Sequence, residues 1–340
     1  MSVFNWLFRR EPPPGEATAR ETREALDRIL NLAPQLRLVT NHAARLAPAI
    51  RCALEYVRAL TEDVPIAREA SAAAWSSDPH IHAFFAVSED VTRAQSRSAE
   101  LRAYFDRNAL DREAFVLLGM AMTERRTLGV AQHGDAVRTD VERTTVSFGD
   151  HQVRVCERNE SELRDEIVLR VVEQLALEAL DRIAADVSRR GLLEQERALL
   201  NTRLMLLGRQ GKGMNSLLDG NRLSGVGEMA ALQAQLEENN RKLAGLGLKT
   251  DALEREISMV CEMLTSPGPY IQVEKRTLRL DRTNVIVDDD HQRESTEIRV
   301  HLARVPGALQ ESRAFCLVRF ARNDLHAVPR MSDDANQWLL

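Results

Sequence analysis

The sequence has few aromatic residues and no long apolar run. Phe, Trp and Tyr make up only 4% of its 340 residues, although apolar residues of all kinds reach 44%. Leu and Ala supply most of that apolar content, which is typical of proteins dominated by helices. No stretch of 18 consecutive apolar residues occurs, so the sequence predicts no transmembrane helix.

An excess of positive charge is also lacking. Lys and Arg number 46 against 51 Asp and Glu, which gives a formal net charge of −5. A protein that binds nucleic acid through its phosphates needs a basic surface. Residues 313–320, RAFCLVRF, loosely resemble the ribonucleoprotein-1 strand of RNA-recognition motifs. Leu317 replaces a stacking aromatic residue there, and residues 269–340 carry eleven acidic and eleven basic side chains. Nucleic-acid binding is therefore not predicted.

No cysteine pair and no catalytic motif is present. Four cysteines lie far apart in the sequence without a CxxC pair, at Cys52, Cys156, Cys261 and Cys316. This usage suits a reducing compartment, and residues 1–10 do not resemble a secretory signal, so we predict a cytoplasmic protein. There is no GxSxG motif, and the glycines around Lys212 lack the spacing of a P-loop. We predict no enzyme activity and no cofactor.

Two long segments with apolar residues at spacings of three and four occupy residues 161–264. The first runs from about Leu163 to Leu207 and the second from Glu228 to Leu264. The second carries Met229, Leu232, Leu236, Asn239, Leu243, Leu246, Thr250, Leu253, Ile257, Val260 and Leu264 in one series. This is the a/d pattern of a left-handed coiled coil. Residues 208–227 between the segments hold six of the sixteen glycines, so we expect the chain to turn back there.

Such a turn predicts an antiparallel coiled-coil hairpin. Facing residues would have numbers that sum to about 435, so that Leu207 lies near Glu228. The same rule places Gly191 opposite Gly245, which suggests a close helix contact or a bend. The alternative is a parallel dimer in which each segment pairs with its copy, and Asn239 would then set the register.

The sequence predicts an α+β protein that is predominantly helical. The expected parts are an N-terminal tip (1–16), a helical bundle (17–126), a small, mostly antiparallel β head (127–158 and 269–325), the hairpin (159–268) and a tail (326–340). Alternating and β-branched residues predict strands at 127–131, 144–155, 270–280, 285–287, 298–305 and 315–321. Gly149-Asp150 is read as a hairpin turn, and Asp111 as the cap of a helix that reaches about Arg125.

The favoured function is that of an interaction or scaffolding protein. A long exposed arm offers apolar stripes for helix-on-helix recognition of a protein partner or of a second copy. The partner would bind the glycine-rich tip, residues 208–227, whose candidate contact residues are Lys212, Met214, Leu217, Leu218, Arg222 and Leu223.

A peripheral membrane protein is the first alternative. A short amphipathic segment near the start of the chain combines apolar and basic side chains, namely Phe4, Trp6, Leu7, Phe8, Arg9 and Arg10. Such a segment can insert weakly into an anionic membrane surface. In that case we expect weak contact with the inner face of a membrane.

A metal-dependent enzyme is the second alternative. Asp78, His80 and His82 lie close in the sequence, and an HxH pair on an extended strand would direct both rings to one side. Asp78-Pro79 is equally compatible with a simple helix stop within a loop over residues 76–87.

Overall fold

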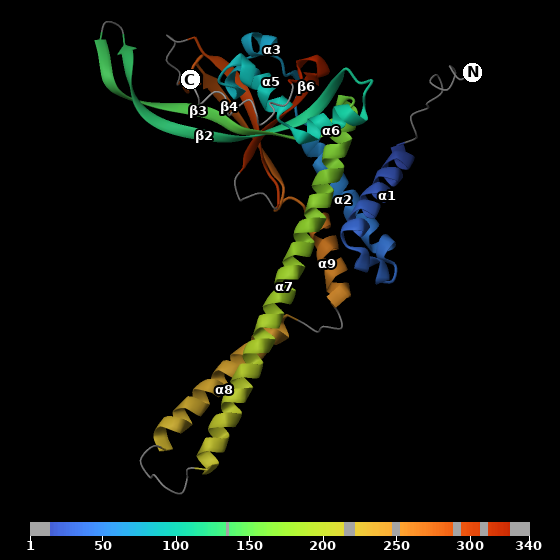
Figure 1. The fold of residues 1–340 in the computed structure, drawn as a ribbon, viewed down its shortest axis with the longest axis vertical. Coiled ribbons are helices and arrows are strands. Elements are labelled where there is room, and N and C mark those ends of the chain that lie inside the picture. The colour runs from blue at the N-terminus through green and yellow to red at the C-terminus, as the bar shows by residue number, and fades with distance from the viewer. Residues whose placement is uncertain are drawn as a thin grey trace, which may run out of the picture. The chain divides into compact units, whose positions relative to one another are not determined.

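A computed structural model describes residues 14–133, 136–213, 222–246, 252–287, 294–306 and 312–326. It contains helices and one antiparallel sheet, which confirms the α+β prediction (Figure 1). The chain divides into two compact units: unit 1 is Met1–Ile50 with Leu175–Thr265, and unit 2 is Arg51–Gln174 with Ser266–Leu340. Helices α2 (His42–Glu62) and α7 (Glu160–Gly213) each contribute residues to both units.

Unit 2 is built on the sheet. The strands are β1 (Arg68–Glu69), β2 (Glu113–His133), β3 (Ala136–Glu157), β4 (Gln272–Leu280), β5 (Thr296–Arg304) and β6 (Arg313–Ala321). Their order is β3-β2-β6-β5-β4 with antiparallel neighbours, and the short β1 pairs in parallel with β6. The prediction that strands before and after the long helical segments join in one mostly antiparallel sheet is confirmed.

The sheet curls because the segment after β4 also reaches β3. The backbone N–H of Val146 donates to the carbonyl of Asn284 at 2.8 Å, and that of Ile286 donates to the carbonyl of Thr144 at 2.8 Å. Asn284 adopts a left-handed backbone with φ 58°, a conformation that Asn tolerates better than most residues. The edge of the sheet at β3 is therefore partly paired.

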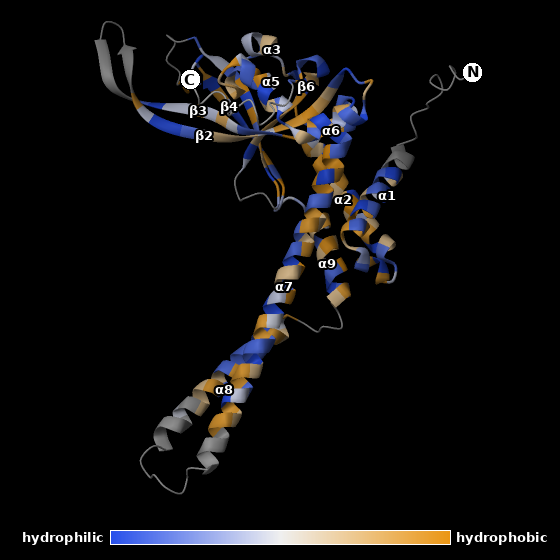
Figure 2. Cartoon of the chain, in the orientation of Figure 1, coloured by the Kyte–Doolittle hydropathy of each residue, from blue (hydrophilic) through white to orange (hydrophobic). Residues whose placement is uncertain are grey.

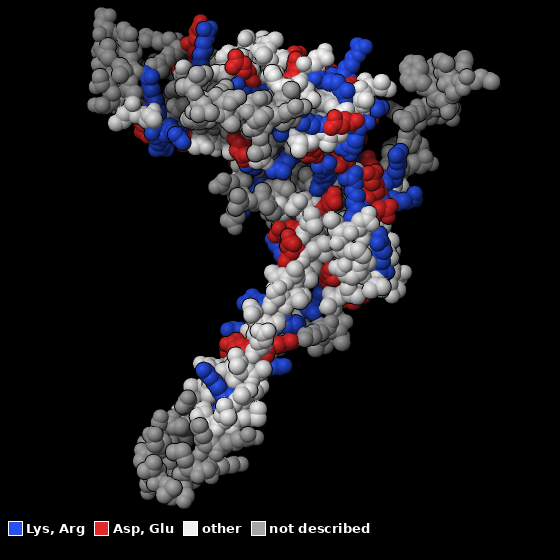
Figure 3. Space-filling view, in the orientation of Figure 1, with Lys and Arg blue, Asp and Glu red and all other residues white. Residues whose placement is uncertain are grey.

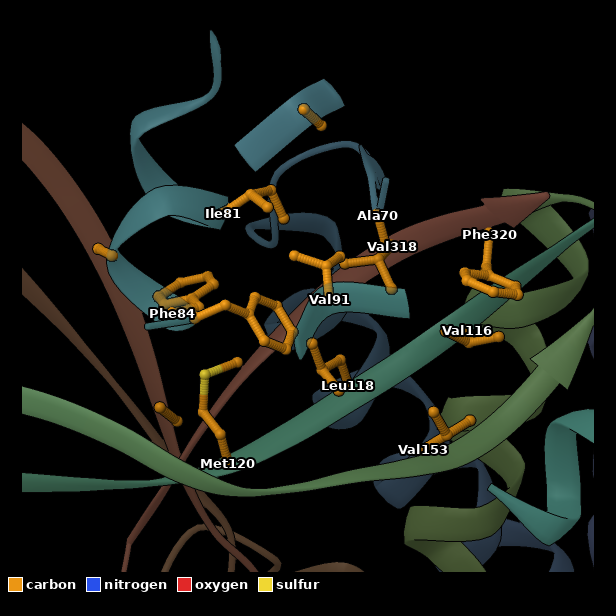
Figure 4. Packing of buried hydrophobic residues seen from close by; sticks show 14 of the residues in the cluster. Ala70, Ile81, Phe84, Val91, Val116, Leu118, Met120, Val153, Val318 and Phe320 are labelled. Atoms are coloured by element: carbon orange, nitrogen blue, oxygen red, sulfur yellow. The ribbon is translucent and has the colours of Figure 1, made fainter. Parts of the chain in front are cut away.

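Four short helices cover one face of the sheet: α3 (Ala72–Ser77), α4 (Pro79–Phe84), α5 (Ser88–Ser96) and α6 (Ala99–Arg107). Their apolar side chains form the core of unit 2 with alternate residues of the strands (Figure 4). Leu118, Met120 and Phe320 are at most 1% exposed. Removing this much apolar surface from water is the main force that stabilises such a layer.

The predicted helix from Asp111 to Arg125 is wrong, because these residues form most of β2. Phe115, Leu118 and Met122 happen to fit a helical spacing, but they belong to a nearly continuous apolar run. A run of this kind does not distinguish a buried strand from a buried helix by its period. The bundle predicted over 17–126 also divides, since α3–α6 pack on the sheet of unit 2, whereas residues 17–50 belong to unit 1.

Gly149-Asp150 is not a hairpin turn but part of a bulge inside β3. Gly119 of β2 faces Gln152, and Ala121 faces Gly149, so two residues of β3 oppose one of β2. Asp150 takes a φ of 48°, which the bulge requires and which Asp accepts more readily than a branched residue. The true hairpin connects β2 to β3 between His133 and Ala136.

Unit 1 is helical. Its first part contains α1 (Pro14–Leu32), the 3₁₀ turn η1 (Pro34–Leu38) and the beginning of α2, and its second part includes α9 (Ala252–Thr265). Gln35 donates to the Glu256 carboxylate at 2.5 Å, and Arg45 forms an ion pair with Glu254 at 2.6 Å. These contacts join α9 to residues more than 200 positions earlier.

The long helical segments differ in part from the prediction. Helix α7 continues to Gly213, and α8 (Arg222–Gly245) begins at Arg222, so both helices extend into the predicted interruption, 208–227. The described part of the second segment consists of two helices, α8 and α9 (Ala252–Thr265). A close helix contact at the glycines is wrong, because a Cβ at Gly191 or Gly245 would meet no atom within 4 Å.

Candidate functional site

Helices α7 and α8 bury residues at the spacing of a heptad seam. On α7, Leu193 and Leu200 are 9% and 6% exposed; on α8, Leu232 and Asn239 are 7% and 3% exposed. The two helices run side by side in unit 1 (Figure 1). Each helix therefore turns one stripe of residues away from solvent.

Two hydrogen bonds connect α7 to α8 and to the residue that follows α8. The Asn239 amide donates from Nδ2 to Oε2 of Glu196 at 2.9 Å, and Arg190 donates from Nη2 to the carbonyl of Leu246 at 2.6 Å. The residue numbers sum to 435 in the first pair and 436 in the second. Oδ1 of Asn239 is buried without a hydrogen-bond partner, so this polar group is only half satisfied.

A second apolar stripe on α7 faces solvent. Leu192, Leu199 and Leu206 are 68%, 68% and 54% exposed, and they follow one another at intervals of seven residues. Seven residues are close to two turns of a helix, so the three side chains lie nearly in line. Val187 and Met205 are also exposed, but they are 18 residues apart, or five turns, and lie on a different face. Figure 2 shows hydrophobic residues along much of α7, and Figure 3 shows neutral surface between its charged clusters.

Of the six residues predicted to contact a partner at the tip, three lie within the described residues. Met214, Leu217 and Leu218 lie outside the described residues, as do all six residues of the predicted membrane segment, 4–10. Lys212 lies in the last turn of α7, and Arg222 and Leu223 lie in the first turn of α8. The tip and the membrane segment both stay predictions.

The Asp78 region has an identifiable structural role. Residues 79–84 form helix α4 rather than a loop or an extended strand, because Asp78 caps it and Pro79 suits its first turn. Asp78 accepts a hydrogen bond from the backbone N–H of His80 at 2.8 Å and pairs with Arg68 at 2.7 Å. Burial opposes ionisation of Asp78, but the hydrogen bonds from His80 and Arg68 outweigh burial and keep its pKa below the usual value.

The two histidines of the HxH pair point to different surroundings. His80 accepts at Nε2 from the backbone N–H of Arg299 at 3.2 Å. His82 instead lies against the ring of Trp75, with the ring centroids 4.4 Å apart. The expectation that both rings face one side is wrong, because residues two apart on a helix diverge. Within the described ranges, no three His, Cys, Asp or Glu side chains are arranged to hold a metal ion.

Two partly buried cysteines are poorly suited to nucleophilic chemistry. Burial raises the pKa of the Cys316 thiol to about 12, and burial with the nearby Glu100 raises that of Cys156 to about 12. The reactive form of cysteine is the thiolate, so both side chains are protonated at neutral pH. They are best described as small residues packed against the core of unit 2.

An apolar cavity of about 520 Å³ lies in unit 2 on the other face of the sheet. Its walls come from the last turns of α2, the first turns of α7, and strands β2 and β6. Phe115, Leu117, Phe315 and Leu317 pack on this face, while their neighbours along the strands face the core. The sequence shows β2 as an apolar run, and nothing in it shows which helices cover the second face.

The polar residues of the cavity are mostly arginines with partners. Arg164 donates to the carbonyls of Thr61 and Val64 and pairs with Glu160 at 2.6 Å. Arg170 pairs with Glu166 and with Glu100, and Arg313 pairs with Asp150 at 2.8 Å. Arg154 is exposed and donates to the side chain of Gln152.

Comparison with known proteins adds no relative: no protein-family model, no curated protein and no solved structure matches the chain. Among the helices described, none combines the length and the apolar character needed to cross a membrane.

Proposed function

We propose that this protein is an interaction or scaffolding protein without catalytic activity, and that α7 and α8 form an antiparallel coiled-coil arm. The partner in this proposal is a protein helix, including the same helix of a second copy. The observation that carries the proposal is the stripe of Leu192, Leu199 and Leu206, each more than half exposed. An apolar stripe at heptad spacing is suited to packing against another helix.

The antiparallel arrangement is supported by the contacts between the helices. The pairs Asn239–Glu196 and Arg190–Leu246 follow the sum expected when the chain folds back near the centre of residues 208–227. The buried positions on the facing parts of α7 and α8, Leu193 with Leu200 and Leu232 with Asn239, each repeat after seven residues, as residues between two wound helices do.

A cysteine pair tests the arm itself. In a Cys52→Ser background, Glu196→Cys with Asn239→Cys should form a disulfide under mild oxidation. The cross-linked product should keep the mass of one chain under denaturing conditions. A product with the mass of two chains would instead support the parallel dimer.

The interaction is tested on the full chain with Leu192→Gln, Leu199→Gln and Leu206→Gln combined. Sedimentation equilibrium of the wild type should show association that rises with concentration, and this variant should abolish it. The matched control is Val187→Gln with Met205→Gln, because these residues are equally exposed but lie on another face.

A different protein as the partner is tested by affinity capture with the same three chains. A specific protein retained by the wild type and the control, and lost by the triple variant, would support the stripe. Deletion of residues 208–227 then tells whether the tip contributes as well. If neither the triple variant nor the deletion changes association or capture, the arm is not the binding surface.

A further inference from the structure

The apolar cavity of unit 2 is partly open to solvent. Its volume of about 520 Å³ is within the usual range of small-molecule sites, roughly 300–1,000 Å³. The cavity is therefore large enough to hold a small molecule.

The walls of the cavity are mainly aliphatic. Val57 and Leu60 come from α2, Ile167 and Val171 from α7, and Leu117 and Phe315 from the sheet. Phe315 is the one aromatic residue among the described lining residues. Flat aromatic ligands are usually held by stacked rings, whereas flexible methylene chains need only aliphatic surface. The lining favours an alkyl chain.

Gly119 leaves open space on the same side of β2. A Cβ at this position would touch only the backbone oxygen of Gln152, at 3.8 Å, which is ordinary contact. Gly119 has no left-handed backbone that would require glycine. Since Gly119 lines the cavity, a larger side chain there would occupy the cavity without straining the strand.

The charges of the lining single out Arg154. Arg164, Arg170 and Arg313 each form an ion pair with a carboxylate of unit 2. Arg154 has no carboxylate within ion-pair distance among the described residues; it hydrogen bonds to the Gln152 side chain. Because Arg154 is exposed, its guanidinium can bind an anionic group that stays at the mouth of the cavity.

We propose that the cavity binds a free, single-chain fatty carboxylate. Its alkyl chain lies between the sheet and the α2 and α7 segments, and its carboxylate binds Arg154 beside Gln152. The bulk of the affinity comes from removing the chain from water, and Arg154 selects for the anionic head.

Calorimetric titration of the purified full chain with dodecanoate tests this site. Saturable binding with one molecule per chain is expected. Gly119→Leu should abolish it while the thermal unfolding temperature of the free protein is kept or raised, because the side chain fills the cavity and stiffens the strand. That control separates a blocked site from a misfolded protein.

Selectivity for the head group provides the second readout. Arg154→Gln should weaken dodecanoate binding by about tenfold, the effect of one charge-assisted hydrogen bond, and leave dodecanol binding unchanged. The control is Arg126→Gln, since Arg126 is exposed on β2 outside the cavity lining. This substitution should change neither dodecanoate binding nor dodecanol binding.

Two outcomes would overturn the proposal. One is the absence of saturable dodecanoate binding, or binding that Gly119→Leu leaves intact. The other is binding to phosphatidylcholine vesicles without binding to free dodecanoate, which would assign the cavity to a bilayer contact instead.

Discussion

The two regions built around helix α7 differ in how their apolar residues are used. In unit 2, the side chains of the core are almost fully buried between the sheet and α3–α6. In the α7–α8 region of unit 1, several large apolar side chains of α7 are more than half exposed. Apolar surface that does not stabilise the folded chain is available to stabilise a complex. The buried apolar side chains that stabilise unit 2 and the exposed ones on α7 therefore lie in different parts of the chain.

The largest effect should come from removing a core side chain. Leu118→Ala in unit 2 should lower the free energy of unfolding by about 3 kcal/mol, because a fully buried Leu leaves a cavity behind. Leu199→Ala in unit 1 should change it by less than about 0.5 kcal/mol, since Leu199 is 68% exposed.

Urea unfolding can measure the effect on unit 2 through Trp75, whose indole N–H donates to the carbonyl of Phe85 at 2.8 Å. Replacing Trp6 and Trp338 by Phe leaves Trp75 as the single tryptophan reporter. If Leu118→Ala and Leu199→Ala lowered the free energy of unfolding equally, the two regions would not differ in how their apolar side chains stabilise the fold.

A smaller effect is expected at the cap of α4. Asp78→Ala should lower the free energy of unfolding of unit 2 by about 1–2 kcal/mol, because the helix loses its cap and Arg68 loses its ion-pair partner. Asp78→Asn should cost less, since Asn also caps helices well.

The same residue makes unit 2 sensitive to acid. The pKa of Asp78 is lowered in the folded protein. The ionised carboxylate therefore contributes fully to the free energy of unfolding above the unfolded pKa of about 3.9, and this contribution is lost as the pH falls below that value. The free energy of unfolding measured with urea should therefore fall more steeply between about pH 5 and pH 2 for the wild type than for Asp78→Asn. Parallel pH profiles for the two proteins would show that Asp78 is not the responsible group.

In the α7–α8 region, Asn239→Leu should stabilise rather than destabilise. It replaces a buried amide whose Oδ1 lacks a partner, so we expect a gain of about 1 kcal/mol in thermal unfolding monitored by circular dichroism. The same substitution should allow more than one register of helix pairing, because a buried Asn at a seam position selects one register. Sedimentation velocity should show more than one species, and a single unchanged species would argue against a register role.

The smallest effect concerns the predicted membrane segment. Removing residues 1–10 should leave the unfolding of both units unchanged and lower flotation with anionic liposomes only slightly, since a single short anchor binds weakly. The matched variant is Arg9→Gln with Arg10→Gln, which removes the charge and keeps the apolar residues. Equal flotation of all three proteins rules out the membrane segment.

Much of the sheet could be predicted because its later strands are amphipathic. Ile298, Val300 and Leu302 alternate with exposed or polar residues and form β5 as expected. Residues of β2 are apolar on both faces because helices cover both, so the alternation that identifies a half-buried strand is lost. Gly149-Asp150 fits a turn as well as a bulge in the sequence, since both favour a residue that accepts positive φ.

The cavity depends on tertiary structure and could not be predicted. Its walls contain residues from α2, from α7, from the strands before α7 and from the strands after α9. Only the fold brings these segments together. The buried positions of α7 and α8 repeat at heptad spacing, which is local and visible in the sequence. The packing of α9 against η1 joins residues more than 200 positions apart, which no short-range pattern encodes.

Strand β2 also has a consequence for hydrogen exchange. It pairs with β6 only as far as Met120, and β3 receives its last described contact from residues 284–286 near Thr144. Beyond Arg126, the described backbone consists of β2 and β3 alone, and a two-stranded ribbon opens easily in water. One continuous strand should thus show two exchange regimes: slow amides from Ala114 to Met120, and fast amides toward His133. The residue at which exchange changes from slow to fast would mark where the sheet of unit 2 ceases to protect the amides of β2 from exchange.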